Sequence, residues 1–378
     1  MKIPFSFKIP SLALAAVLGF GLGCMSPAFG QQNAVSYLID LNSKAVTQLG
    51  SLGGDTYASA INDAGQVVGS SATAKLGPNF DPGLHAFITG PNGAGIRDLG
   101  GSGYIVTASD INDAGQVAGS SFPGPDAPAN NGFITGPNGM GVVDLRTLGD
   151  FGSNAPAYGI NNAGQVVGQS GVLAFITGPN GVGKTSLGTL GGTFSSARAI
   201  NDTGQVVGLS ATAEVGGGDH TFITGPNGVG LTDLGTLGGR SSFPQAINDA
   251  GQVVGQSDTA TGGHHAFITG PNGVGMIDLG TLGGTFSSAS DINDAGQVVG
   301  WSDTAAGGDH AFITGPNGVG VADLNTLVDL PAGVVLSSAS GINNLGQVIA
   351  VAVIPEPSSY ALLLAGMGLV SFMARRKK

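Results

Sequence analysis

Residues 288–324 read SASDINDAGQVVGWSDTAAGGDHAFITGPNGVGVADL, and this stretch decides the fold. It contains four short strand signals, at Ser288–Asn293, Gln297–Ser302, His310–Thr314 and Val321–Leu324. Asn293–Gly296 and Gly315–Gly318 predict tight turns within the first and the second pair, because Asn and Asp tolerate turn conformations and Gly supplies a positive φ. Four strands in about 46 residues are typical of one blade of a β-propeller.

The second strand signal is apolar at consecutive positions. Val298 and Val299 are adjacent, which predicts that both faces of this strand are buried. A blade stacked between two neighbours requires such a strand, whereas a half-exposed strand would alternate apolar and polar residues. Gly300 follows, and we expect crowding toward the propeller axis at this position.

The stretch is one copy of a repeat. Ile-Asn followed by Gly-Gln-Val occurs at Ile61, Ile111, Ile160, Ile200, Ile247, Ile292 and Ile342, with spacings of 40 to 50 residues. Periods of this length indicate propellers or solenoids. Ser36–Gly54 mimics only strands three and four of a repeat, and Ser337–Val353 supplies only strands one and two. We therefore predict an all-β, seven-bladed β-propeller with one blade shared between the termini, because this sharing closes a ring without free edges; a β-solenoid is the alternative.

Composition limits the partners. The chain has 378 residues, 69 of them Gly, and its apolar fraction of 41% is high enough to bury a core. The only cysteine, Cys24, lies near the N-terminus, so we expect no disulfide in the mature protein. Without the two terminal segments the chain has 7 basic and 23 acidic residues, a net charge near −16. This balance disfavours nucleic acid and anionic membranes as partners.

Residues 1–30 are typical of a signal peptide. Lys2 and Lys8 precede an apolar run at Ser11–Leu22, and small residues before Gln31 predict cleavage between Gly30 and Gln31. The alternative is a lipoprotein signal in which Cys24 takes the lipid.

The C-terminal segment, residues 355–378, has three parts. Pro355-Glu356-Pro357 is followed by an apolar run at Tyr360–Met373 and by the basic residues 375–378. As a helix the run would measure about 21 Å, shorter than a bilayer core of ~30 Å, which favours a transient membrane hold. The segment resembles the PEP-CTERM sorting signal of Gram-negative bacteria. The resemblance implies export, processing at Pro355, Glu356 and Pro357 by an exosortase, and release or attachment at the cell surface, with membrane contact only through this segment beforehand.

The repeats of residues 31–354 also resemble the HAF family of extracellular repeat proteins. The His-Ala-Phe tripeptide stands at residues 85–87, 265–267 and 310–312, and blade four has His220-Thr221-Phe222. Two copies depart, with Asn131-Gly132-Phe133 and Leu173-Ala174-Phe175, so the Phe is the better core candidate. The resemblance implies a fold and an extracellular location but no chemistry.

One motif suggests a nucleotide site. Gly178–Thr185 matches the phosphate-binding pattern G-x-x-x-x-G-K-[ST], with Lys184 as its lysine. The same Gly-Pro-Asn-Gly turn recurs at Gly90, Gly136, Gly225, Gly270 and Gly315. A phosphate-binding loop must open a helix, whereas a strand is expected here. We therefore interpret the motif as a repeat turn.

The remaining polar motifs follow the repeat. Histidines 85, 220, 265 and 310 share one repeat position, with His264 beside His265, and we expect each to bond locally; a weak metal site beside Asp219 or Asp309 stays open. Asn-Asp-x-Gly, first seen at Asn62, favours a turn over a calcium loop. The sequence assigns no catalytic, cofactor-binding or metal-binding residue, since departures from the repeat are mostly in loop length.

The linker between strands two and three varies most. It spans Ser70–His85 and Ser120–Gly132 in two repeats but only Gln169–Ala174 in the next. Such rim loops carry recognition in many propellers, but the plainer interpretation is neutral variation of the surface. Trp301 marks either a sugar-stacking surface or the cover of a blade edge. We expect a non-enzymatic binding or matrix protein with extracellular polysaccharide or surface proteins as partners; the alternatives are a glycan lyase or hydrolase using acids near the axis, and a purely structural repeat.

Overall fold

The computed structural model describes residues 33–73, 83–100, 105–122, 130–152, 154–214 and 217–354. Residues Gly30, Gln31, Pro355, Glu356 and Pro357, with the two terminal segments and most of the long rim linkers, lie outside these ranges. Within them, no helix has the length and apolar character needed to cross a membrane. Ala34–Ile354 form one compact unit.

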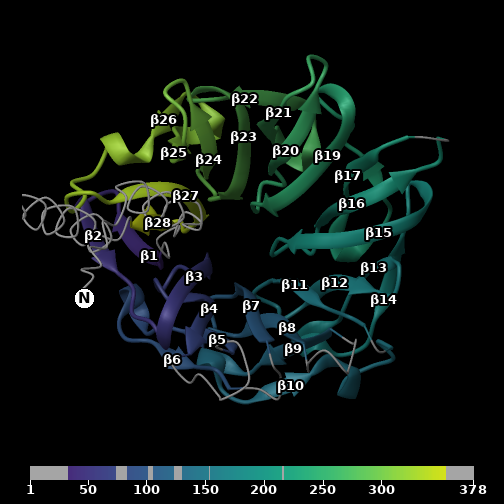
Figure 1. Ribbon diagram of the computed structural model, residues 1–378. Coiled ribbons are helices and arrows are strands. Elements are labelled where there is room, and N and C mark those ends of the chain that lie inside the picture. Colours follow the sequence, from purple (N-terminus) through teal and green to yellow (C-terminus); the bar gives the residue numbers. More distant parts are fainter. Residues whose placement is uncertain are drawn as a thin grey trace, which may run out of the picture. The chain divides into compact units, whose positions relative to one another are not determined.

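The strands of this unit form seven blades of four antiparallel strands each (Figure 1). Blade one contains β3 (Gly53–Ile61), β4 (Val67–Thr73), β5 (Leu84–Ile88) and β6 (Arg97–Asp98), and blade two contains β7 (Ile105–Ile111), β8 (Val117–Phe122), β9 (Asn131–Thr135) and β10 (Val142–Asp144). Blade three contains β11 (Ala157–Ile160), β12 (Val166–Ser170), β13 (Leu173–Ile176) and β14 (Thr185–Gly188). Blade four contains β15 (Gly191–Ile200), β16 (Val206–Thr212), β17 (Asp219–Ile223) and β18 (Thr232–Asp233).

Blades five to seven complete the ring. Blade five contains β19 (Gly238–Ile247), β20 (Val253–Thr259), β21 (His264–Thr269) and β22 (Met276–Gly280), and blade six contains β23 (Gly283–Ile292), β24 (Val298–Thr304), β25 (Asp309–Thr314) and β26 (Val321–Asp323). Blade seven joins β27 (Val335–Ile342) and β28 (Gln347–Ile354) to β1 (Asn33–Asp40) and β2 (Ala45–Gln48) from the other end of the unit. The predicted seven-bladed fold with one shared blade is confirmed.

Short 3-10 turns connect the third and fourth strands. They are η1 (Pro91–Gly93), η2 (Pro137–Gly139), η4 (Pro179–Gly181), η5 (Pro226–Gly228), η6 (Pro271–Gly273) and η7 (Pro316–Gly318); η3 (Leu145–Thr147) and η8 (Leu324–Thr326) follow the fourth strands of blades two and six. In η4, Asn180 has a φ of 56°, and β14 follows the turn, so Gly178–Thr185 leads into a strand as predicted. Lys184 Nζ donates to Ser170 Oγ at 3.0 Å.

A bulge in the innermost strand explains the Gly that the second strand carries in blades one to six. In blade six the pairing of β23 with β24 shifts register between Ala289 and Asp291. A Cβ on Gly300 would overlap the main-chain oxygen of Ser288 and would lie 2.9 Å from Cε1 of Phe312. The crowding at Gly300 therefore arises inside the blade, from the bulge and the Phe ring. The prediction of crowding toward the axis was wrong.

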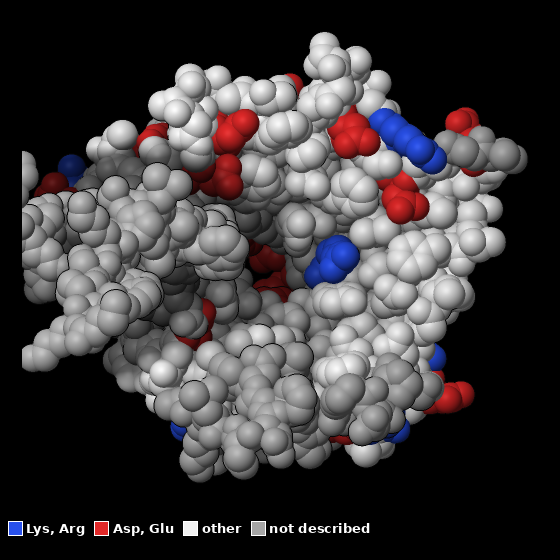
Figure 2. Space-filling view, in the orientation of Figure 1, with Lys and Arg blue, Asp and Glu red and all other residues white. Residues whose placement is uncertain are grey.

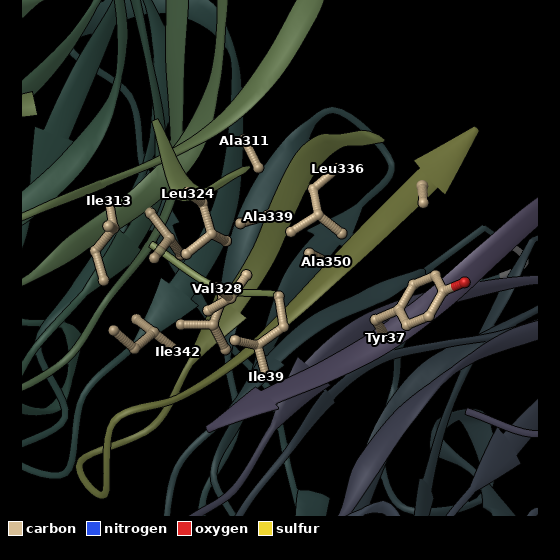
Figure 3. Packing of buried hydrophobic residues seen from close by; sticks show 13 residues of the cluster. Tyr37, Ile39, Ala311, Ile313, Leu324, Val328, Leu336, Ala339, Ile342 and Ala350 are labelled. Atoms are coloured by element: carbon tan, nitrogen blue, oxygen red, sulfur yellow. The ribbon is translucent and has the colours of Figure 1, made fainter. Parts of the chain in front are cut away.

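The core lies between the blades. Among the described residues, an apolar cluster fills each junction, and Figure 3 shows the one between blades six and seven, where Ile313 and Leu324 face Ile342 and Ile39. The Phe of the repeat is at most 2% exposed in blades one to six, which confirms its place in the core. Val298 and Val299 are both fully buried, as predicted. Stacking each blade on two neighbours therefore stabilises the ring.

Candidate functional site

The first strands of the blades surround a central channel. After each of these strands comes the conserved Asn of the repeat, and its side-chain Nδ2 donates to the main-chain oxygen of the equivalent Asn in the next blade. These bonds, 3.0–3.3 Å long, form a closed circle that we call the amide girdle, made by Asn62, Asn112, Asn161, Asn201, Asn248, Asn293 and Asn343. Each blade is thus tied to the next around the whole ring.

The Gln of the repeat holds each girdle Asn in place. In blade one, Asn62 Oδ1 accepts from the main-chain N–H of Gln66, and Asn62 Nδ2 donates to Gln66 Oε1. Gln66 Nε2 then donates to Asn138 Oδ1 in the turn of blade two at 3.3 Å. The Asn-Asp-x-Gly motif is thus a turn, as interpreted, and its side chains also join the blades.

The residue after each girdle Asn forms a second circle, at one mouth of the channel. Its main-chain N–H donates to the side-chain Oδ1 of the equivalent residue in the next blade at 2.8–3.1 Å. This acidic girdle consists of Asp63, Asp113, Asn162, Asp202, Asp249, Asp294 and Asn344. The five carboxylates are close enough to repel one another.

The two Asn residues of the acidic girdle reduce this repulsion. Asn162 Nδ2 donates to Asp113 Oδ2 at 2.8 Å and to Asp202 Oδ2 at 2.7 Å. Asn344 bridges Asp294 and Asp63 in the same way. Asp249 has an Asp on both sides, and its pKa is raised by burial and by the charges of those neighbours.

Two further carboxyl groups lie deeper in the channel. Asp110 and Asp291 line a cavity of about 280 Å³ at the axis. Asp110 accepts from the N–H of Ile111 and, across the blade junction, from the N–H of Ile160, at 2.8 and 2.9 Å. Asp291 makes the same pair of bonds in blades six and seven. Burial raises the pKa of Asp110 to about 6; burial, with a smaller effect of the Asp110 charge, raises that of Asp291 to about 7.

The residues that line the channel differ most between blades at the repeat position directly before that of Asp110 and Asp291. There it is lined by Ser59, Ser109, Tyr158, Arg198, Gln245, Ser290 and Ser340, and a cavity of about 350 Å³ also touches Trp301. We call this part the polar vestibule. Figure 2 shows acidic groups inside the central opening and one basic group at its edge, and Arg198 is the single Lys or Arg lining the channel among the described residues. Trp301 lies on β24, between β23 and β25, and lines this cavity together with Ser290 of β23.

Sequence reasoning missed these channel residues. It attributed departures from the repeat mostly to loop length, whereas the positions of Asp110 and Arg198 are occupied by Ala60 and Ser59 in blade one. The signal in the sequence was that the two residues before the Ile-Asn of each repeat differ in charge and polarity from copy to copy. It went unnoticed because the sequence does not show that these positions face the axis.

The histidines lie elsewhere, on the third strands. His85, His220, His265 and His310 each place Nδ1 at 2.7–2.9 Å from an Asp of the fourth strand in the same blade. The His264 ring lies against the Phe286 ring, tilted by 37°, with the ring centroids 4.6 Å apart. The predicted local bonding of the four repeated histidines is confirmed. Among the described residues, no group of three or more His, Cys, Asp or Glu is arranged to hold a metal ion.

Comparisons with known proteins identify the tail and the fold. Residues 353–377 match the PEP-CTERM protein-sorting motif, and no curated protein matches the chain. The β-propeller domain of the Trilobed protease from Pyrococcus furiosus, described as having an open velcro topology, is 11% identical with a TM-score of 0.51, over 75% of this chain and 86% of that one. Puromycin hydrolase is 14% identical with a TM-score of 0.51, over 84% of this chain and 52% of that one.

A TolB from Acinetobacter baumannii is 10% identical with a TM-score of 0.44, over 76% of this chain and 62% of that one. The chain thus spans about half the length of puromycin hydrolase and under two thirds of that TolB. At 11% and 14% identity, the likeness to the Trilobed protease propeller and to puromycin hydrolase concerns the fold alone. The sorting motif implies export, exosortase processing and sorting to the cell surface of a Gram-negative bacterium. The chain thus has a seven-bladed β-propeller as its body and a match to the PEP-CTERM protein-sorting motif at residues 353–377.

Proposed function

We propose that the protein is a non-catalytic binding protein of the cell surface, with extracellular polysaccharide as its partner. The polar vestibule carries this proposal, because it combines hydroxyl groups, an amide, a guanidinium and two aromatic side chains in one cavity. Such a set suits a polyol ring, which offers hydroxyls at its edge and an apolar face. The sorting motif and the resemblance to HAF repeats support an extracellular setting.

The hydrogen bonds of the channel support a binding role over catalysis. Both oxygens of Asp110 and of Asp291 accept main-chain N–H groups, so these acids hold neighbouring blades together. The girdle side chains have the same role. A scaffold tied in this way keeps the vestibule rigid, which lowers the entropy that binding costs.

A glycan array and a hydrolase and lyase panel test the proposal on the full-length protein purified in detergent. We expect saturable binding of one class of polysaccharide without turnover. Absence of any glycan binding would overturn the proposed function.

One observation favours an enzyme as the second candidate. Asp110 and Asp291 line the same cavity with pKa values raised to about 6 and about 7, in the range that general acid catalysis requires. Glycan cleavage by the wild-type protein that is abolished in Asp291→Ala, with binding retained, would establish this alternative.

A further inference from the structure

Arg198 is a cation without an anionic partner in the channel. Its guanidinium carbon lies 5.0 Å from the centroid of the Tyr158 ring. Its side chain makes no hydrogen bond or ion pair with any residue that the structure describes, although the protein has a net charge of −11. Stacking on an aromatic face fixes a guanidinium and leaves its N–H donors free at the edge.

The channel acids do not neutralise Arg198. A guanidinium paired with a carboxyl group lowers the pKa of that group, but burial, main-chain hydrogen bonds and, for Asp291, the Asp110 charge are what shift the pKa values of Asp110 and Asp291. Their oxygens are also occupied by main-chain N–H groups. Because a partly buried charge is costly without a partner, the guanidinium is placed to receive an anion from outside the protein.

The groups around Arg198 limit what that anion is attached to. The vestibule adds serine hydroxyls, the Gln245 amide and the indole of Trp301, in a cavity of about 350 Å³. This volume is at the lower end of the range for ligand sites and suits one sugar ring. Hydroxyl and amide groups match the hydroxyls of a sugar, and an aromatic ring matches its apolar face, whereas a peptide would require main-chain partners.

We propose that the polar vestibule binds a uronic acid residue of an acidic polysaccharide, with the Arg198 guanidinium paired to the sugar carboxylate. This inference rests on the proposed function and adds the site and the ligand class. A fork of two parallel N–H···O bonds from Arg198 supplies selectivity for the carboxylate. Tyr158 acts as a positioning residue that holds the guanidinium.

The experiment uses the single tryptophan of the chain as a local probe, because Trp301 lines the vestibule. The full-length protein in detergent is titrated with β-1,4-tetramannuronate and with β-1,4-mannotetraose, which differ at C6 as carboxylate and hydroxymethyl. A tetrapeptide with a free carboxylate is the third ligand. Trp301 emission and calorimetry are recorded for the wild type, Arg198→Ala and Arg198→Lys. Arg240→Ala is the matched control, since Arg240 is a basic residue outside the vestibule.

We expect tetramannuronate to change Trp301 emission saturably and to bind at least about tenfold more tightly than mannotetraose. Arg198→Ala should lower the affinity for tetramannuronate to that for mannotetraose. The tetramannuronate affinity of Arg198→Lys should lie between those of the wild type and Arg198→Ala, and that of Arg240→Ala should equal the wild-type value. Equal affinity for the two sugars, an unchanged Arg198→Ala variant, or preference for the peptide would overturn the inference. Glycan binding that is indifferent to Arg198 would leave the proposed function standing, whereas no binding of any glycan would remove both.

Discussion

Asp110 and Asp291 show how two blade junctions differ from the other five. Each carboxyl spans a junction, and the next blade has Gly at the same position, Gly159 or Gly341. The same two blades carry Asn162 and Asn344 in the acidic girdle. Asn162 and Asn344 are neutral and lie next to the junctions that hold the buried carboxyl groups. They therefore reduce the negative charge along the channel.

The buried carboxyl of Asp291 predicts a pH dependence of stability. Its pKa is about 7 in the folded protein, against 3.8 for an ordinary Asp side chain, so the folded state retains the proton between these pH values. The contribution of Asp291 to the free energy of unfolding therefore falls as the pH rises from about 4 to about 7. Asp291→Ala introduces the residue that blade one has at this position, Ala60. As the pH rises through this range, the free energy of unfolding of the variant should increase relative to that of the wild type by on the order of a few kcal/mol.

Urea unfolding at pH 4 and pH 8 measures this difference. At pH 4 the variant should be the less stable protein, because it loses the two hydrogen bonds of Asp291. Ser290→Ala is the control on the same strand, and its difference from wild type should not change with pH. Parallel pH profiles for Asp291→Ala and the wild type would contradict the prediction.

Gly300 should tolerate no side chain. Its added Cβ would meet the Ser288 oxygen and the Phe312 ring, so Gly300→Ala should lower the free energy of unfolding by about 1–3 kcal/mol or more. Blade seven carries Ala350 at the same register, opposite Ala339. Ala350→Gly is therefore the reverse control and should cost no more than about 1 kcal/mol. Urea unfolding that ranks the two variants in the opposite order would show that the bulge yields easily.

At the scale of the strand and its turn, the four strands predicted in residues 288–324 are all present, although β23 begins at Gly283 and not at Ser288. The tight turns after the first and third strands were predictable, because Asn-Asp-Ala-Gly and Gly-Pro-Asn-Gly restrict backbone conformation locally. The girdles were not predictable. They depend on which residue of the next blade each side chain reaches, and that requires the curvature of the assembled ring.

The acidic girdle predicts a stabilising substitution. Asp249→Asn removes a charge from between Asp202 and Asp294 and gives both a donor, as Asn162 does for its neighbours. Because the Asp249 side chain is only partly shielded from solvent, we expect the free energy of unfolding to rise by about 0.5–1 kcal/mol at pH 8 and low salt. The gain should shrink as the pH falls, because the raised pKa of Asp249 lets its carboxyl group take up a proton at a higher pH than an ordinary Asp does.

Thermal unfolding measures this gain, with Asp113→Asn as the matched control. Asp113 already accepts from Asn162 Nδ2, so its replacement removes the same charge but also an acceptor. We expect no stabilisation from it. If both variants were stabilised equally, the net charge of the girdle, and not the bridging hydrogen bonds of its Asn residues, would determine the stability.

For the whole molecule, counting half-repeats at the two ends was enough to predict the ring. The axial site was not predictable from the same count. Ser59, Tyr158, Arg198 and Gln245 come from different blades, and only the closed ring brings them to one cavity. The repeats predict the scaffold because every copy packs in the same way. A site depends instead on the positions at which the copies differ, and on the ring shape that brings those positions together.

Ring closure predicts how the unit responds to loss of its first two strands. Deleting residues 33–50 removes β1 and β2, which leaves β28 with an unpaired edge and takes Tyr37, Ile39 and Leu38 out of two junction clusters. A circular permutant that begins at β3 and joins β28 to β1 by a short linker keeps every strand pair. It recreates the connection that the other blades have between their second and third strands.

We expect the permutant to unfold in one cooperative transition like the wild type, and the deletion variant to lose that transition and aggregate through its open edge. Calorimetry and size-exclusion chromatography distinguish these outcomes. Each junction is closed by an apolar cluster and by the two girdles, and blade seven meets blade one through the bond from Asn343 to Asn62. A deletion variant that stays monomeric and cooperative would mean that six blades and half of the seventh suffice, and that closure gives the propeller its channel but not its stability.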